Sequence, residues 1–132
     1  MNFLLDTHTF LFSVFGTPKL GKKAEEAILD TNNTIFVSAV SFWEISLKYS
    51  LGKLDLVNVA PDDLPHISLE MGFTLLILSP EDAAAYHRLE RFGHNDPFDR
   101  MLIWQAIRKN YILISKDAGF KNYAHLGLRV IW

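Results

Sequence analysis

The stretch "NFLLDTHTFLFSVFG" (2–16) contains a sharp change of structure within fifteen residues. Its first four residues, 2–5, form an apolar run of the length expected for a buried strand. Asp6 interrupts this run, and the residues that follow predict a short helix that ends near Gly16. A buried strand therefore passes directly into a helix, with a carboxylate at the junction.

The same alternation of short apolar runs and helical segments continues along the chain. Further strands are predicted at 34–40, 73–79, 111–116 and 128–132. Further helices are predicted at 22–30, from Ser38 or Ser41 to about 51, and at 61–71, 80–92 and 97–109. Continuous apolar strands that alternate with helices are typical of a parallel sheet covered on both faces. We therefore expect one α/β domain spanning residues 1–132.

Composition narrows the class of protein. The chain has 132 residues, no cysteine and a formal net charge of −2. The missing cysteines exclude disulfides and thiolate metal sites, and together with a poor signal sequence they favour a cytoplasmic protein. No apolar run approaches the roughly 18 residues that a membrane span needs. The slight negative charge argues against a broad nucleic-acid footprint, although a local basic groove remains compatible with it.

Four acids fall where the predicted elements would bring them to one edge of the sheet. Asp6 and Asp117 end the first and fourth strands, Glu44 lies one to two turns into the helix after the second strand, and Asp99 lies in the first turn of the helix before the fourth. Ligands of such sheets bind outside the carboxyl ends of the strands. Converging carboxylates repel one another unless they are protonated or neutralised by cations. Oxygen ligands alone favour Mg²⁺ or Mn²⁺ over Zn²⁺.

The segment "HNDPFDRMLIWQA" (94–106) also has a purely structural interpretation. Asp96 is a good N-cap, Pro97 is a good first helical residue, and Asp99 occupies the third position of an acidic capping box. This interpretation explains Asp96 better than it explains Asp99.

The other three acids have structural interpretations as well. Asp6 and Asp117 can each cap the turn or helix that follows a strand. Glu44 can pair with Lys48, four residues further along its helix. These interpretations explain the acids one at a time, but they do not explain why four acids converge on one end of the sheet.

Four segments together resemble a known family. They are "LLDTHTFLF" (4–12), "VSAVSFWEISLKYSLGKL" (37–54), "HNDPFDRMLIWQA" (94–106) and "LISKD" (113–117). In this order they resemble PIN-domain proteins, specifically the VapC-type toxin ribonucleases of bacterial type II toxin–antitoxin pairs. The resemblance implies a three-layer α/β/α, Rossmann-like fold with a central parallel sheet of about five strands.

The resemblance also implies a Mg²⁺- or Mn²⁺-dependent endoribonuclease site. The family's catalytic positions carry over onto Asp6, Glu44, Asp99 and Asp117, the acids that the strand ends select. We expect Asp6 and Asp99 to be the principal metal ligands, with Glu44 and Asp117 completing the acidic shell. Asp96 is expected to be a cap that flanks the site. The number of metal ions stays open.

The partners implied by the resemblance are an RNA substrate, for example transfer RNA, a small antitoxin and a second copy in a homodimer. Candidate phosphate contacts are Lys48, Arg100 and Lys116, which lie close in sequence to the acids. Lys48 has the alternative of pairing with Glu44, and Arg100 that of pairing across the fold. His8 and His94 have two interpretations, either as substrate contacts or as side chains that order their loops.

Two other classes of function are compatible with parts of the pattern. A receiver or phosphatase-like domain also places aspartates at strand ends. However, the chain lacks the paired acids of receivers, and Asp6 is followed by "THT" rather than by the "DxDx[TV]" pattern of haloacid-type phosphatases. A module that binds RNA or a protein without cleaving anything is the non-enzymatic alternative.

Overall fold

The structure is a computed structural model that describes residues 1–16, 19–93 and 95–132. The described residues form one five-stranded sheet in the order β3-β2-β1-β4-β5. All neighbouring strands are parallel. The strands are β1 (Asn2–Leu5), β2 (Thr34–Ser38), β3 (Thr74–Leu76), β4 (Ile112–Ile114) and β5 (Arg129–Ile131). The predicted parallel sheet of about five strands is confirmed.

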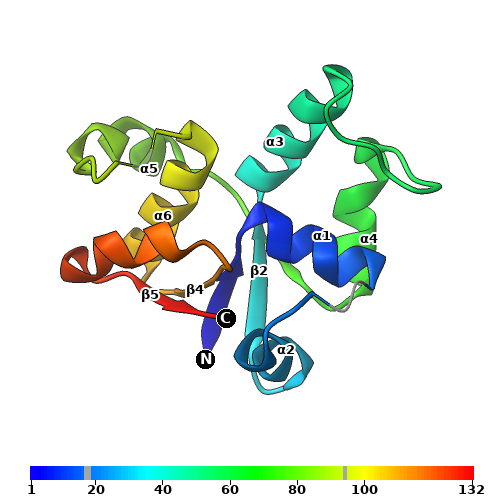
Figure 1. The fold of residues 1–132 in the computed structure, drawn as a ribbon, viewed down its shortest axis with the longest axis horizontal. Helices are drawn as coiled ribbons and strands as arrows, with labels where there is room; N and C mark the ends of the chain where they lie inside the picture. The colour runs from blue at the N-terminus through cyan, green and yellow to red at the C-terminus, as the bar shows by residue number, and fades with distance from the viewer. Residues whose placement is uncertain (17–18, 94) are drawn as a thin grey trace.

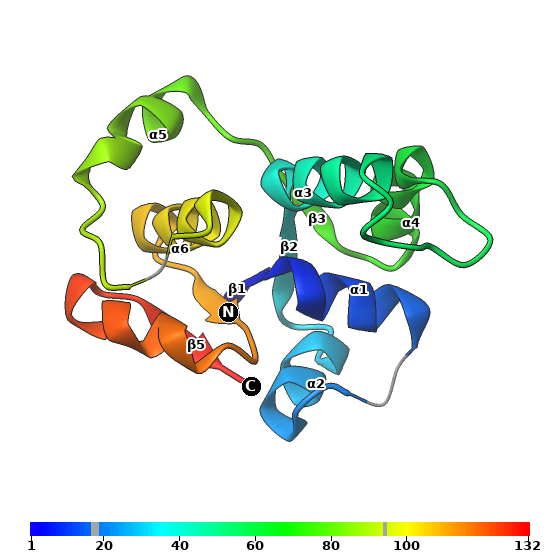
Figure 2. The same ribbon diagram turned by 45° about the horizontal axis from the view of Figure 1, so that its top comes forward.

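Helices cover both faces of this sheet, as Figures 1 and 2 show. One layer contains α1 (Thr7–Phe15), α2 (Lys22–Leu29), α3 (Ala39–Ser50) and α4 (Leu64–Glu70). The other contains α5 (Pro80–Ala85) and α6 (Pro97–Lys109). Short 3-10 helices occupy Pro61–Asp63, Tyr86–Arg88 and Ala118–Leu126. Within the described residues, no helix is long and apolar enough to cross a membrane.

The central strand β1 explains why the strands read as continuous apolar runs. Phe3 and Leu5 belong to the core cluster under α1 to α4, whereas Leu4 belongs to the cluster under α6. Successive side chains of a strand point to opposite faces, and here both faces are buried. The three buried positions, Phe3 to Leu5, must therefore be apolar, and the run ends where the chain leaves the sheet at Asp6.

Several predicted boundaries were wrong because apolar residues next to a strand do not have to extend it. β2 ends at Ser38, whose hydroxyl accepts a hydrogen bond from the Val40 N–H and starts α3, so the predicted strand to residue 40 is too long. β3 covers 74–76 rather than 73–79. The predicted helix 80–92 ends as a 3-10 turn at Arg88. The 3-10 helix after Asp117 was not predicted.

Close contact with Gly21 fixes the end of β5 against α2. Gly21 precedes α2, and a Cβ atom placed on it would lie 2.6 Å from the backbone carbonyl carbon of Trp132. The Trp132 ring also meets Phe12 of α1 edge-on, with 6.4 Å between the ring centroids. Figures 1 and 2 both show this end of the chain beside α2. Trp132 therefore joins the sheet edge to the helical layer.

We predict that Gly21→Ala destabilises the protein, because the new methyl group overlaps the Trp132 backbone. Overpacking of this kind costs about 1–3 kcal/mol of unfolding free energy. Urea unfolding followed by circular dichroism measures the change. The neighbouring Lys22→Ala removes an exposed side chain and should stay within about 0.5 kcal/mol of the parent. Equal stability of the two variants would contradict the contact.

Candidate functional site

The loops at the carboxyl ends of β1 and β4 surround a cavity of about 310 Å³. We call it the acidic cavity. Asp6 follows β1, Asp117 follows β4, and Asp99 comes from the first turn of α6. The residues that line it are Asp6, His8, Phe12, Asp99, Lys116, Asp117 and Phe120. Three of the four predicted acids thus come together around one cavity.

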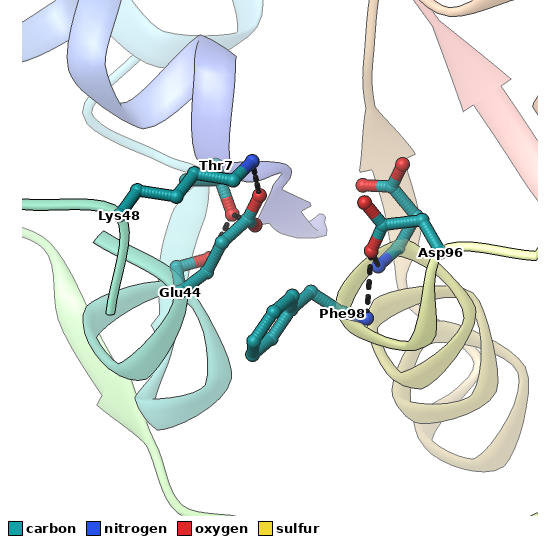
Figure 3. A network of polar contacts seen from close by, with 7 residues as sticks. Thr7, Glu44, Lys48, Asp96 and Phe98 are labelled. Atoms are coloured by element: carbon teal, nitrogen blue, oxygen red, sulfur yellow. Dashed lines mark hydrogen bonds and ion pairs between the residues drawn. The ribbon is translucent and has the colours of Figure 1, made fainter. Parts of the chain in front are cut away.

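Glu44 lies beside this cavity without lining it. Its side chain projects from α3, is almost completely buried, and accepts a 2.6 Å hydrogen bond from the Thr7 hydroxyl. Lys48 forms an ion pair with the other carboxylate oxygen (Figure 3). A buried carboxylate needs such partners. The alternative prediction, that Lys48 pairs with Glu44, is confirmed.

Thr7 is a site residue that the sequence analysis missed. Its hydroxyl donates to Glu44 and also lies 3.0 Å from the Ser41 hydroxyl oxygen. Thr7 directly follows Asp6, so one junction supplies both an acid of the cavity and the contact that links α1 to α3. The signal available in the sequence was a hydroxyl residue directly after the first acid.

Two of the acids are held in place by the backbone of the helix that each begins. Asp6 Oδ1 accepts from the Thr9 N–H at 2.8 Å, and Asp117 Oδ1 accepts from the Gly119 N–H at 2.8 Å. The predicted capping roles of Asp6 and Asp117 are therefore confirmed. Both side chains still line the acidic cavity while they cap these helices. Capping is thus compatible with a further role at the cavity.

Asp96 caps α6 with one oxygen atom. Its Oδ1 accepts from the Phe98 N–H at 2.8 Å (Figure 3). The same oxygen accepts from the Asp99 N–H at 3.1 Å. Asp96 and Asp99 therefore begin the same helical turn, and the cap fixes the backbone from which the Asp99 side chain projects. The predicted cap and first-turn positions are confirmed.

Burial raises the pKa of Asp99 to about 7, from an ordinary value of 3.8. The charges of Asp96, Glu44, Asp6 and Asp117 raise it further, in that order. Four carboxylates therefore repel the ionised form of Asp99. A proton or a bound cation relieves that repulsion.

The oxygen atoms that these acids offer are the type of ligand that a hard divalent cation prefers. Asp6, Asp99 and Asp117 offer carboxylate oxygens around the cavity, and repulsion among the acids favours a counter-charge. Among the residues that the structure describes, however, no three His, Asp or Glu side chains lie close enough together to hold a metal ion. The acids are thus grouped around a cavity rather than closed into a coordination shell.

Arg100 does not face this cavity, which contradicts its predicted role as a phosphate contact. Its side chain is 2% exposed. The guanidinium donates to the hydroxyls of Tyr86 and Tyr123 and to the carbonyl oxygens of Leu89 and Glu90, over 2.9–3.1 Å. These partners confirm the alternative, that Arg100 pairs across the fold. Sequence proximity to Asp99 was misleading because successive residues of a helix point in different directions.

Three further residues, Lys116, His8 and His94, are candidates for contacts with a substrate. Lys116 is exposed and lines the acidic cavity, as a phosphate contact requires. His8 is exposed, lines the same cavity and packs near Phe12, with 6.4 Å between the ring centroids. His94 lies outside the described residues.

Sequence and structure comparisons agree on the fold. The family model described as "PIN domain" matches residues 3–126. No curated protein matches the chain. The solved structure of VapBC2 from Rickettsia felis, bound to a DNA fragment from its promoter, contains a similar chain. Its TM-score is 0.68 at 19% identity, and the match covers 100% of this chain and 99% of that one.

Two further solved structures have the same fold. In VapBC-1 from nontypeable Haemophilus influenzae the TM-score is 0.65 at 16% identity, with 99% of this chain and 97% of that one covered. In FitAcB from Neisseria gonorrhoeae it is 0.55 at 19% identity, with 98% and 96% covered. At these low sequence identities, the similarity shows that the chains share a fold, and the matches cover nearly the whole chain.

The raised pKa of Asp99 predicts a pH-dependent penalty on stability. The folded state holds this proton more tightly than the unfolded state, so the penalty begins above pH 3.8 and is complete above about pH 7. In EDTA, Asp99→Asn should therefore melt above the parent, by about 3–6 °C at pH 8. The gain should shrink as the pH falls toward 5.

Thermal unfolding from pH 5 to pH 8 measures this difference. The exposed Asp62→Asn serves as the matched control, and its melting temperature should follow the parent at every pH. A difference between Asp99→Asn and the parent that stays constant with pH would show that neither burial nor the neighbouring acids raise the pKa of Asp99.

Proposed function

Because the chain belongs to the PIN domain family, we propose that it is a divalent-metal-dependent endoribonuclease that hydrolyses RNA phosphodiester bonds. The observation that carries this proposal is the placement of Asp6, Asp99 and Asp117 around one cavity at the carboxyl ends of β1 and β4. PIN domains are generally nucleases, and a cavity lined by acids from separate elements suits phosphoryl chemistry assisted by cations.

In this proposal Asp6 and Asp99 are the principal ligands of Mg²⁺ or Mn²⁺. The cation, when bound, lowers the pKa of its water and neutralises phosphate charge. Asp6 presents its carboxylate from a fixed position because its Oδ1 is held by the Thr9 N–H. Asp99 would hold the cation as an ionised carboxylate, since a nearby positive charge favours the ionised form.

Glu44 and Asp117 complete the acidic shell in the same proposal. Glu44 is fixed by Thr7 and Lys48, so it acts on the cavity mainly through its charge or through a bridging water. Asp117 is exposed and lines the cavity. Asp96 positions Asp99 by capping α6. No side chain of the cavity has to act as the nucleophile, because activated water suffices.

The solved structures of similar fold further support a toxin role. Their names describe VapBC and FitAcB assemblies rather than isolated chains. We therefore extend the proposal to a cytoplasmic toxin that forms a homodimer and is inhibited by a small antitoxin protein. The antitoxin would cover the acidic rim, where a basic side chain would find complementary charge.

The first test is cleavage of total cellular RNA by purified, antitoxin-free protein in Mg²⁺, Mn²⁺ or EDTA. Discrete products are expected with either cation and not with EDTA. Asp6→Asn and Asp99→Asn should each lower the rate by about 10²-fold or more, because each removes a ligand charge from the site. Asp62→Asn should cleave like the parent.

The other outcomes of this assay are informative. Equal products from the parent and from Asp6→Asn would indicate a contaminating nuclease and contradict the assignment. RNA binding that does not depend on metal, with no product from folded protein, would favour the non-catalytic binding module. A phosphoaspartate trapped at Asp6 would favour the phosphatase-like alternative.

The inhibitor proposal predicts that the protein encoded beside this chain's gene binds it and suppresses cleavage. Size-exclusion chromatography with light scattering measures the complex, and the RNA assay measures the inhibition. The complex should contain two copies of this chain. A monomer that neither binds the neighbouring product nor loses activity in its presence would contradict the toxin–antitoxin assignment.

A further inference from the structure

A second cavity, also of about 310 Å³, lies directly beside the acidic cavity. We call it the lysine cavity. It is lined by Lys23, Ser115, Lys116, Asp117, Ala118, Lys121, Val130, Ile131 and Trp132. Lys116 and Asp117 line both cavities, so the loop after β4 forms the wall between them. Whatever occupies one cavity therefore lies next to the other.

Three separate elements each contribute one lysine to this cavity. Lys23 comes from α2, Lys116 from the loop after β4, and Lys121 from the 3-10 helix Ala118–Leu126. All three side chains are exposed, and no ion pair is found for them among residues 1–16, 19–93 and 95–132. Among the residues that the structure describes, Asp117 is the one acidic side chain that lines the cavity. Three ammonium groups against one side-chain carboxylate leave a net positive side-chain charge there.

The packing of the fold determines how these lysines come together. Gly21 contacts the backbone and the ring of Trp132, and this contact brings the start of α2 to the end of β5. Lys23 follows two residues later, so it reaches the cavity because Trp132 can approach Gly21 closely. Val130, Ile131 and Trp132 form the apolar part of the wall. The cavity is thus shaped by the same contact that joins the sheet edge to the helices.

We propose that the lysine cavity binds a backbone phosphate of the RNA strand whose neighbouring phosphodiester bond lies in the acidic cavity. This inference rests on the proposed function, and it assigns Lys23 and Lys121, together with Lys116, as the groups that hold the substrate. Lysine ammonium groups are compact charges with three donors each and suit phosphate oxygens. The acidic cavity repels a polyanion until a cation arrives, so attraction has to come from beside it.

This arrangement also accounts for an RNA-binding protein with a net charge of −2. Electrostatic attraction of a nucleic acid depends on where the cations lie, and three lysines around one cavity form a local positive site. The apolar wall at Trp132 gives a sugar or base a surface to lie against. A single strand suits this pair of small neighbouring cavities better than a rigid duplex does.

The test is RNA binding in the absence of cleavage. The probe is a fluorescein-labelled single-stranded RNA oligonucleotide of mixed sequence, and fluorescence anisotropy in EDTA and 0.1 M KCl gives the Kd. Asp6→Asn is the parent background, which prevents turnover by traces of metal. Adding Lys23→Ala and Lys121→Ala should raise the Kd about 5-fold, since one single-strand phosphate contact contributes a salt exponent of roughly 0.7.

The salt dependence gives a second readout, which separates a lost phosphate contact from a loss of uncharged contacts. The slope of log Kd against log salt should fall by about 0.7 in the double variant, because one phosphate loses its contact. The matched control is Lys22→Ala with Lys53→Ala, which removes the same charge from exposed positions that do not line the lysine cavity. Its Kd and slope should stay close to those of the parent background.

Three results would overturn the inference. They are an unchanged Kd in the double variant, an equal loss in the control, and a loss of affinity for the antitoxin with RNA binding intact, which would assign the cavity to an acidic peptide. Circular dichroism establishes that each variant is folded.

Failure of this inference and failure of the proposed function are distinguishable. Metal-dependent cleavage by the protein with Asp6 intact, combined with lysine-independent binding, would retain the nuclease and remove the lysine cavity from its substrate path. Lysine-dependent binding without any cleavage would retain the lysine cavity as an RNA site and contradict the proposed nuclease activity.

Discussion

Repulsion between carboxylates at one end of the sheet is the constraint on which the rest of the site depends. All strands are parallel, so the chain leaves β1 and β4 at the same edge, and each exit carries an acid. The pKa of Asp99, about 7, reflects its burial among four other acids. Such a cluster is stable only with partners for its charges, and the fold supplies backbone N–H groups, the Thr7 hydroxyl and Lys48.

The same contacts serve both helix formation and the site. Asp6, Asp96 and Asp117 each accept a backbone N–H that begins a helix, and this contact also fixes the carboxylate. The capping role of these acids and a role at the site are therefore compatible. A cap holds one carboxylate oxygen at low conformational cost, because the helix that it starts is itself anchored in the core.

The basic side chains of the protein fall into two groups, those that pair within the fold and those that are exposed on its surface. Arg100 is buried inside the fold, where its hydrogen bonds join the segment around Leu89 to the helix that contains Tyr123. Lys48 neutralises Glu44. Three exposed lysines line a cavity that shares a wall with the acids. In the proposed function, these lysines would attract the RNA, and the separation of the two charges would let a polyanion bind beside the acids before it enters the acidic cavity.

The sequence by itself determined the alternation of strands and helices, the parallel sheet, and the strand-end positions of Asp6 and Asp117. These features are encoded locally, in apolar runs, caps and the residues at which runs end. Only the tertiary structure decided the burial of Arg100, the distance of Glu44 from the cavity, and the meeting of Lys23 with Lys116 and Lys121. Those outcomes depend on which helix face packs inward and on Trp132 approaching Gly21, contacts between residues far apart in the chain. No local pattern records such contacts, because they arise only when the layers close on one another.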